Sequence, residues 1–124
     1  MADIFLSYSR EDLERVTPLV AAFEREGFSV WWDGALHPGE RFEESIDREI
    51  QIAKCVVVVW SSASVNSQWV KNEALDGADR DALIPILFEP VRLPVAFKQH
   101  QTSDFTRWPI SVDTGQYSRV IDSI

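Results

Sequence analysis

Cysteine is almost absent from this 124-residue chain, which has a single one, Cys55. A disulfide within the chain is therefore excluded, and the composition is typical of a reducing compartment. Cys55 begins an apolar run, so we expect it to pack in the core. The two histidines, His37 and His100, lie in segments that we predict to be loops. One cysteine and two separated histidines do not make a set of zinc ligands, so we expect no metal site.

Basic residues are also few, with 12 Lys and Arg against 20 Asp and Glu, for a net charge of -8. Without a basic face, direct binding to nucleic acid or to an anionic membrane surface is not expected. No apolar run reaches the roughly 20 residues that span a bilayer, and the first residues do not resemble a secretory signal. We therefore expect a cytoplasmic protein without a membrane partner.

Several catalytic motifs are missing as well. No Gly-x-Gly-x-x-Gly sequence or P-loop lysine follows the first predicted strand, and no serine lies in a Gly-x-Ser-x-Gly sequence. These absences argue against a dinucleotide-binding Rossmann site, a P-loop NTPase and an α/β-hydrolase triad.

What is present is an alternation of strand and helix patterns in a chain of single-domain length. The predicted strands are residues 3–8, 28–32, 55–60, 82–88 and 103–106, and the predicted helices are 10–26, 42–53, 67–76 and 116–124, with a short helix near Ala96. Residues 55–60 are apolar without alternation, which is typical of a parallel strand buried on both faces. The pattern predicts an α/β fold with a doubly wound parallel sheet.

Glycine, proline and serine suggest where these elements end. Gly27 and Gly77 are each predicted to end a helix. Either Ser64 or Ser67 is a candidate N-cap for the helix that follows them. Pro85 lies within a predicted strand, which favours an edge position or a strand end.

Ligands in such sheets bind at the carboxyl ends of the strands. Residues 7–10, 33–42 and 61–73 all follow predicted strands, so they can converge on one cleft. Trp69 and Glu73 are four residues apart and therefore share one face of a predicted helix. From spacing alone, the ordinary interpretation is that Trp69 packs in the core and Glu73 is solvated.

Five motifs in order carry a family resemblance. They are Asp3-Ile-Phe-Leu-Ser-Tyr-Ser-Arg10, Gly27-Phe-x-Val-Trp-Trp-Asp33, Leu36-x-Pro-Gly-x-x-Phe42, Ala53-Lys-Cys-Val-Val-Val-Val-Trp-Ser61 and Ser67-x-Trp-Val-x-x-Glu73. The series resembles the Toll/interleukin-1 receptor (TIR) domain family, and most closely its bacterial branch. The resemblance covers residues 3 to about 88 well and the remainder loosely.

The resemblance implies a flavodoxin-like doubly wound sheet of about five parallel strands with helices on both faces. Many members of the family cleave NAD between nicotinamide and ribose, giving ADP-ribose or a cyclic product, whereas others are scaffolds. Glu73 stands at the position of the family's catalytic glutamate. A carboxylate there stabilises the oxocarbenium-like ribose that remains when nicotinamide leaves. Trp69 can stack on adenine or nicotinamide.

The other substrate-binding candidates also come from the resemblance. Tyr8 and Arg10 match positions that flank the nucleotide pocket, and Arg10 is a candidate partner for the diphosphate, or else a solvated residue at a helix start. Phe42 matches an aromatic residue beside nicotinamide, or else is the first core residue of its helix. Asp33 is a further candidate, with bracing of the following loop as its alternative role.

Residues 33–41 match the loop through which assembling family members dock onto a neighbour and complete the active site across two subunits. The candidate assembly residues are Gly34, His37, Pro38, Gly39 and Arg41. His37 stands in a stretch where some active members carry an acidic residue. A plain surface loop is the alternative.

We therefore expect an NAD nucleosidase activated by self-assembly with other TIR domains, in bacterial immune-type signalling. NAD would be its substrate, and no cofactor is expected. The alternative is a non-catalytic module for TIR–TIR assembly. A response-regulator receiver is excluded, because Ser7-Tyr8 and Trp60-Ser61 stand where a receiver needs acidic residues. We expect residues 1–124 to be a single TIR domain from a longer chain with a C-terminal sensor module.

Overall fold

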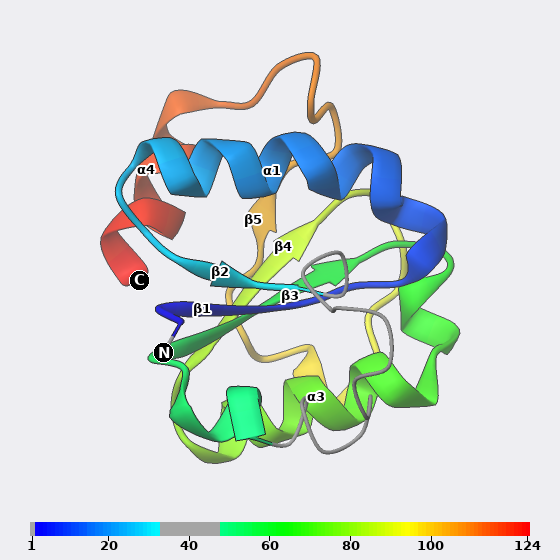
Figure 1. Cartoon of the computed structure of the whole chain (residues 1–124). Helices are drawn as coiled ribbons and strands as arrows, with labels where there is room; N and C mark the ends of the chain where they lie inside the picture. The colour runs from blue at the N-terminus through cyan, green and yellow to red at the C-terminus, as the bar shows by residue number, and fades with distance from the viewer. Residues whose placement is uncertain (1, 33–47) are drawn as a thin grey trace.

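A five-stranded parallel sheet forms the centre of the protein, as expected, and its strand order is β2-β1-β3-β4-β5. The computed structural model describes residues 2–32 and 48–124 (Figure 1). The strands are β1 (Ile4–Ser7), β2 (Val30–Trp31), β3 (Cys55–Trp60), β4 (Leu83–Leu87) and β5 (Ser103–Asp104). All five coincide with predicted strands, which confirms the expected flavodoxin-like α/β class.

Helices cover both faces of the sheet. They are α1 (Leu13–Arg25), α3 (Gln68–Asp79) and α4 (Thr114–Ser123), with short 3₁₀ helices η1 (Arg10–Asp12), η3 (Ser64–Asn66) and η4 (Val95–Phe97). Residues 48–52 are also helical. Figure 1 shows α1 and α4 on one side of the sheet and α3 on the other. The sheet is therefore the middle of three layers.

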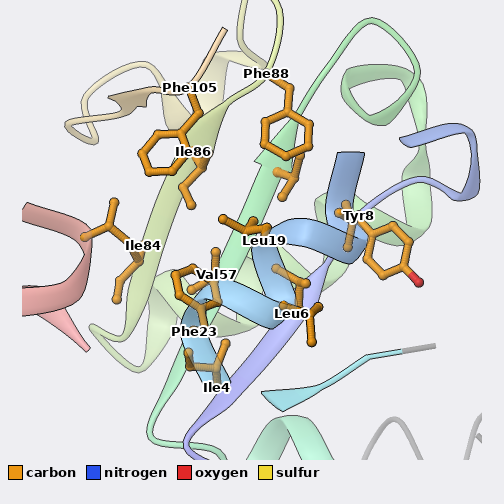
Figure 2. Close-up of a cluster of buried hydrophobic side chains, with 14 of the residues drawn as sticks. Ile4, Leu6, Tyr8, Leu19, Phe23, Val57, Ile84, Ile86, Phe88 and Phe105 are labelled. Atoms are coloured by element: carbon orange, nitrogen blue, oxygen red, sulfur yellow. The ribbon is translucent and has the colours of Figure 1, made fainter. Parts of the chain in front are cut away.

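Strand β3 is buried along its whole length, because its residues alternate between the two layers of helices. Val57 packs on the α1 side, in the cluster drawn in Figure 2. Val58 packs on the α3 side with Val70 and Ala74. This confirms the expectation that the unbroken apolar run is a central strand. Cys55 is buried as expected, and burial raises the pKa of its thiol to about 11.

The tryptophan pair at the end of β2 divides between the same two layers. Trp31 stacks on Phe5, with ring centroids 5.1 Å apart and ring planes 11° apart. Trp32 instead approaches Tyr8 on the α1 side, at 6.4 Å between centroids. Adjacent strand residues point to opposite faces, so two neighbouring tryptophans can each pack against a different layer.

The two predicted helix ends have different outcomes. Gly27 follows α1 with a φ of 97°, as expected for a helix-ending glycine. The prediction for Gly77 is wrong, because α3 continues through it to Asp79, and Asp81 adopts the left-handed conformation instead. Gly77 lies against the sheet, and a Cβ placed there would be 2.8 Å from the Cβ of Val56. The position is glycine because the helix and the sheet approach closely.

Replacing Gly77 by alanine is therefore expected to lower the free energy of unfolding by about 1–3 kcal/mol, the usual range for overpacking a core. In an exposed helix the same change is stabilising by about 1 kcal/mol, so the sign tests the close approach. Urea denaturation is the measurement. Asp79→Ala, at an exposed position of the same helix, is the control and should change stability by less than about 0.5 kcal/mol.

The prediction of an edge position or strand end for Pro85 is also wrong, since Pro85 lies inside β4, between β3 and β5. The reason is the short length of β5, which pairs only with Ile86 and Leu87. The carbonyl of Leu87 accepts from the N–H of Phe105, so Pro85, two residues earlier, also faces the β5 side. Its missing N–H lies beyond the paired residues and removes no bond of the ladder.

Arg15 ties helix α1 to the end of β4 and to the chain after β5. Its Nη2 donates to the carbonyl oxygens of Phe88 and Thr106 at 2.8 and 3.2 Å, with a longer contact of 3.5 Å to Phe105. Its Nε donates to the carbonyl of Trp108 at 2.9 Å, and the indole Nε1 of Trp108 donates back to the Arg15 carbonyl. The guanidinium also lies 4.5 Å from the centre of the Phe88 ring. One side chain thus joins three separate segments.

Candidate functional site

The candidate site lies where the parallel strands β1 and β3 end. β1 ends at Ser7 and leads to η1, while β3 ends at Trp60 and leads through η3 into α3. Ser7 is paired with Val58 in the sheet, so the end of β1 lies beside the last residues of β3. These connections bring η1, η3 and the start of α3 to one edge of the sheet (Figure 1). That edge is where ligands bind in sheets of this class.

Glu73 of α3 is held against β1 by Ser7. The Ser7 hydroxyl donates to Glu73 Oε1 at 2.6 Å, and the contact is buried. Only 8% of Glu73 is exposed, and Ser7 is fully buried. A distance of 2.6 Å is within the range of charge-assisted O–H···O⁻ bonds. The carboxyl group is therefore fixed between a helix and a strand.

Trp69 and Glu73 occupy the environments opposite to those that their residue types favour. Both lie on α3, which begins after Ser67, whose side chain accepts from the N–H of Val70 and serves as the N-cap. Trp69 is 42% exposed, whereas Glu73 is buried. The ordinary interpretation, with Trp69 in the core and Glu73 in solvent, is therefore wrong. An exposed indole and a buried carboxyl group are an unusual combination for a purely structural helix.

Tyr8 and Arg10 follow β1 but are placed differently. Tyr8 is buried in the cluster on the α1 side, as Figure 2 shows, whereas Ser7 and Glu73 meet on the α3 side. Arg10 begins η1 and is exposed. The structure thus brings Glu73 to the end of β1, but it packs the Tyr8 ring on the other face of the sheet. Substrate binding by either residue stays a prediction.

The remaining candidates lie outside the described residues. They are the substrate-binding candidates Asp33 and Phe42 and the assembly residues Gly34, His37, Pro38, Gly39 and Arg41. Their roles stay predictions.

A second buried polar group at this edge was missed by sequence reasoning. Asp12 Oδ2 accepts from the Ser61 hydroxyl at 2.5 Å. The backbone N–H of Ser61 donates to the Ser64 hydroxyl at 2.7 Å, and that hydroxyl donates to the carbonyl of Val59 at 2.7 Å. The network joins η1 to the turn after β3. Ser64, one of the two candidate caps, is used here instead. The only sequence signal was the presence of serines directly after a buried strand.

Burial raises the pKa of Asp12, and the nearby charges of Glu89 and Glu11 act in the same direction. The hydrogen bond from Ser61 and the charge of Arg15 act against it. The folded protein therefore binds the Asp12 proton more tightly than the unfolded chain does. It follows that Asp12 contributes stability that is fully present below the ordinary aspartate pKa of about 4, and that is lost as the pH rises through the raised value.

Replacing Asp12 by asparagine, which keeps an acceptor for Ser61, is expected to remove this loss. The difference in free energy of unfolding, variant minus wild type, should increase between about pH 4 and about pH 7. Urea denaturation at both pH values measures it. Asp104→Asn is the control: the N–H of Thr106 lowers the pKa of Asp104, so the contribution of Asp104 changes mainly below about pH 4, and the difference for this variant should stay nearly constant between the two pH values. A difference for Asp12→Asn that does not change with pH would contradict the argument.

The chemistry available at this edge is that of a carboxylate beside an aromatic ring. Among residues 2–32 and 48–124, no group of three or more His, Cys, Asp and Glu side chains is placed to hold a metal ion. Within the same residues, none of the helices is both long and apolar enough to cross a bilayer.

A fixed carboxylate such as that of Glu73 can stabilise a positive charge that develops on a bound ligand, or bind the hydroxyl groups of the ligand.

Comparison with known proteins agrees with this arrangement. The TIR domain family model matches residues 4–121 of the chain. The NAD(+) hydrolase PdTIR of Paracoccus denitrificans (strain Pd 1222) is 30% identical over 91 residues, which cover 68% of this chain. The match covers only 30% of that relative's length.

Solved structures show the same fold. The TIR domain of the Toll-related receptor TRR-2 from Hydra magnipapillata matches with a TM-score of 0.78 and 26% identity over 86% of each chain. The TIR domains of the activated Roq1 resistosome match with a TM-score of 0.70 and 15% identity over 98% of each chain, a likeness of fold alone. Since the family model spans nearly the whole sequence and the sheet order and the placement of the helices agree, the chain belongs to the TIR domain family.

Proposed function

We propose that this TIR domain cleaves NAD at the bond between nicotinamide and ribose, with Glu73 as the catalytic carboxylate. The observation that carries the proposal is the buried Glu73 side chain, fixed by Ser7 at the carboxyl end of the sheet, one helical turn after the exposed Trp69. The relative from Paracoccus denitrificans, named as an NAD(+) hydrolase, supports the choice of NAD.

The reaction needs a group that stabilises positive charge. When the bond between ribose C1′ and nicotinamide breaks, the electron pair leaves with the pyridine nitrogen, so nicotinamide departs neutral. Positive charge then develops on C1′ and the ring oxygen, as in glycoside cleavage. A carboxylate held beside this carbon stabilises the charge. Water that adds to C1′ loses a proton and gives ADP-ribose, whereas attack by an atom of the same molecule gives a cyclic product.

Trp69 supports the reaction by stacking on a planar ring of NAD. Trp69 is 42% exposed and lies one helical turn before Glu73 on α3. Tyr8, Arg10, Phe42 and Asp33 remain candidates for contacts to the rest of the nucleotide. NAD is the substrate in this proposal, and no cofactor is required.

Self-association is the second part of the proposal. Residues 33–41, which include Gly34, His37, Pro38, Gly39 and Arg41, are the candidate loop for docking onto a second TIR domain. The fold is shared with TIR domains of an activated resistosome. A composite site would make the specific activity rise with protein concentration, so a specific activity that is independent of concentration would contradict this part.

We also propose that the protein acts in the cytoplasm, in immune-type signalling of the bacterial kind.

The test is chromatography of NAD incubated with the purified chain, at high protein concentration or with a crowding agent. We expect nicotinamide together with ADP-ribose or its cyclic form, and the second product distinguishes hydrolysis from cyclisation. Glu73→Ala should release no nicotinamide above the background without protein. Equal release by the wild type and this variant would refute the role of Glu73.

A non-catalytic assembly module is the second candidate function, favoured by the structural likeness to domains that act in an assembly. Light scattering would then show concentration-dependent association without any loss of NAD. An active TIR domain, tested in parallel, is the control for the assay.

A further inference from the structure

Ser7 donates a hydrogen bond to Glu73, and it is not among the candidate site residues that the sequence motifs indicate. It is the last residue of β1 and is paired with Val58 of β3, so its backbone belongs to an inner strand of the sheet. Phe5 and Ser7 share the face of β1 that is covered by α3, because strand residues two apart point the same way. The strand therefore directs the hydroxyl toward the helix.

The contact has the features of a positioning interaction. A serine hydroxyl has a single hydrogen to donate, and here the acceptor is Glu73 Oε1 at 2.6 Å. Both residues are buried, so water competes little for the bond. A hydrogen bond to a charged group is stronger than one between neutral groups. The hydrogen bond from Ser7 therefore restricts rotation of the Glu73 carboxyl group at the end of its flexible side chain.

We propose that Ser7 is a positioning residue, which holds the carboxylate of Glu73 in the orientation that faces the anomeric carbon of NAD. The inference rests on the proposed function, and it adds a residue from a different element of the fold. Ser7 does not touch the reacting atoms. It acts only through Glu73, so its loss should slow the chemical step and leave the binding of NAD nearly unchanged.

The main experiment compares wild type, Ser7→Ala and Ser103→Ala in steady-state nicotinamide release. Ser7→Ala is expected to lower kcat about 10- to 100-fold, the range for loss of a hydrogen bond to a charged group, with KM changed less than about threefold. Ser103→Ala is the matched control, since Ser103 is also a buried serine of a strand but lies in β5, two strands away from β3 and three from β1. It should keep kcat within about twofold.

A second pair of variants separates the hydroxyl from the packing. Ser7→Thr and Ser7→Val add side chains of nearly the same shape, and only threonine can donate a hydrogen bond. We expect Ser7→Thr to have at least about tenfold higher kcat than Ser7→Val. Urea denaturation of both variants shows whether they are folded under the assay conditions. A purely structural role for Ser7 would lower the two activities equally.

The outcomes separate the two proposals. If the wild type releases nicotinamide and Ser7→Ala has the same kcat, the role of Ser7 is wrong and the proposed function stands. If kcat falls equally in Ser7→Ala and Ser103→Ala, the effect is general destabilisation and the role of Ser7 is again wrong. If the wild type releases no nicotinamide in any condition, the proposed function and the role of Ser7 are both refuted.

Discussion

Replacing Glu73 by glutamine is expected to slow nicotinamide release from NAD by at least about 100-fold. Glutamine has nearly the same shape as glutamate and keeps an oxygen that can accept from Ser7, so the packing at the end of β1 should survive. What is lost is the negative charge that would face the developing cation at ribose C1′. The measurement is the initial rate of nicotinamide release at saturating NAD.

The structure makes glutamine a better choice than alanine for this variant. Glu73 is buried, so alanine would leave a cavity and a Ser7 hydroxyl without its acceptor, and both effects are destabilising. The thermal unfolding midpoint of Glu73→Gln should match that of the wild type to within a few degrees. Gln68→Glu, at an exposed position of the same helix, is the control for a change of charge and should keep its activity. A Glu73→Gln variant as active as the wild type would remove the carboxylate from the mechanism.

Replacing Arg15 by methionine is expected to lower the free energy of unfolding by about 2–4 kcal/mol. The reason is that one guanidinium group donates to carbonyl oxygens of Phe88, Thr106 and Trp108, in the partly buried space between α1 and the end of β4. Methionine fills much of the same volume but donates no hydrogen bond. Carbonyl groups left without a donor in this space cost free energy.

Two further variants sharpen the Arg15 prediction. Arg15→Lys keeps the positive charge but lacks the planar fork, so its loss of stability should lie between that of methionine and the wild type. Arg92→Met is the control, because Arg92 is exposed, and it should change stability by less than about 0.5 kcal/mol. Urea denaturation measures all three variants. A loss for Arg15→Met no greater than that for Arg92→Met would contradict the bridging role.

The sequence was most informative where burial and periodicity coincide. The unbroken run that became β3 predicted a central strand because a strand covered on both faces has no polar side, and the alternation of strands and helices gave the parallel sheet. The position of Glu73 at the carboxyl end of the sheet followed from the same order of elements. Its burial did not, because residue type and spacing favoured an exposed glutamate.

Contacts between segments far apart in the chain could not be predicted from local patterns. Ser7 and Glu73 are 66 residues apart, and Asp12 and Ser61 are 49 apart. No periodicity connects such pairs, and only the register of β1 and β3 brings them together. Gly77 shows the same limit, because the sequence does not distinguish a glycine that ends a helix from one that lets a helix approach a sheet.

Gly77 also determines how closely helix α3 can approach the sheet near Glu73, the proposed catalytic residue. Glu73 is four residues before Gly77, about one turn or 6 Å along α3. A helix is stiff over one turn, so any outward shift at Gly77 is transmitted to Glu73. The Ser7–Glu73 distance of 2.6 Å can lengthen by only about 0.6 Å before the bond is lost. A single methyl group is larger than this tolerance. The spacing between α3 and the sheet is therefore restricted to the thickness of a residue without a side chain.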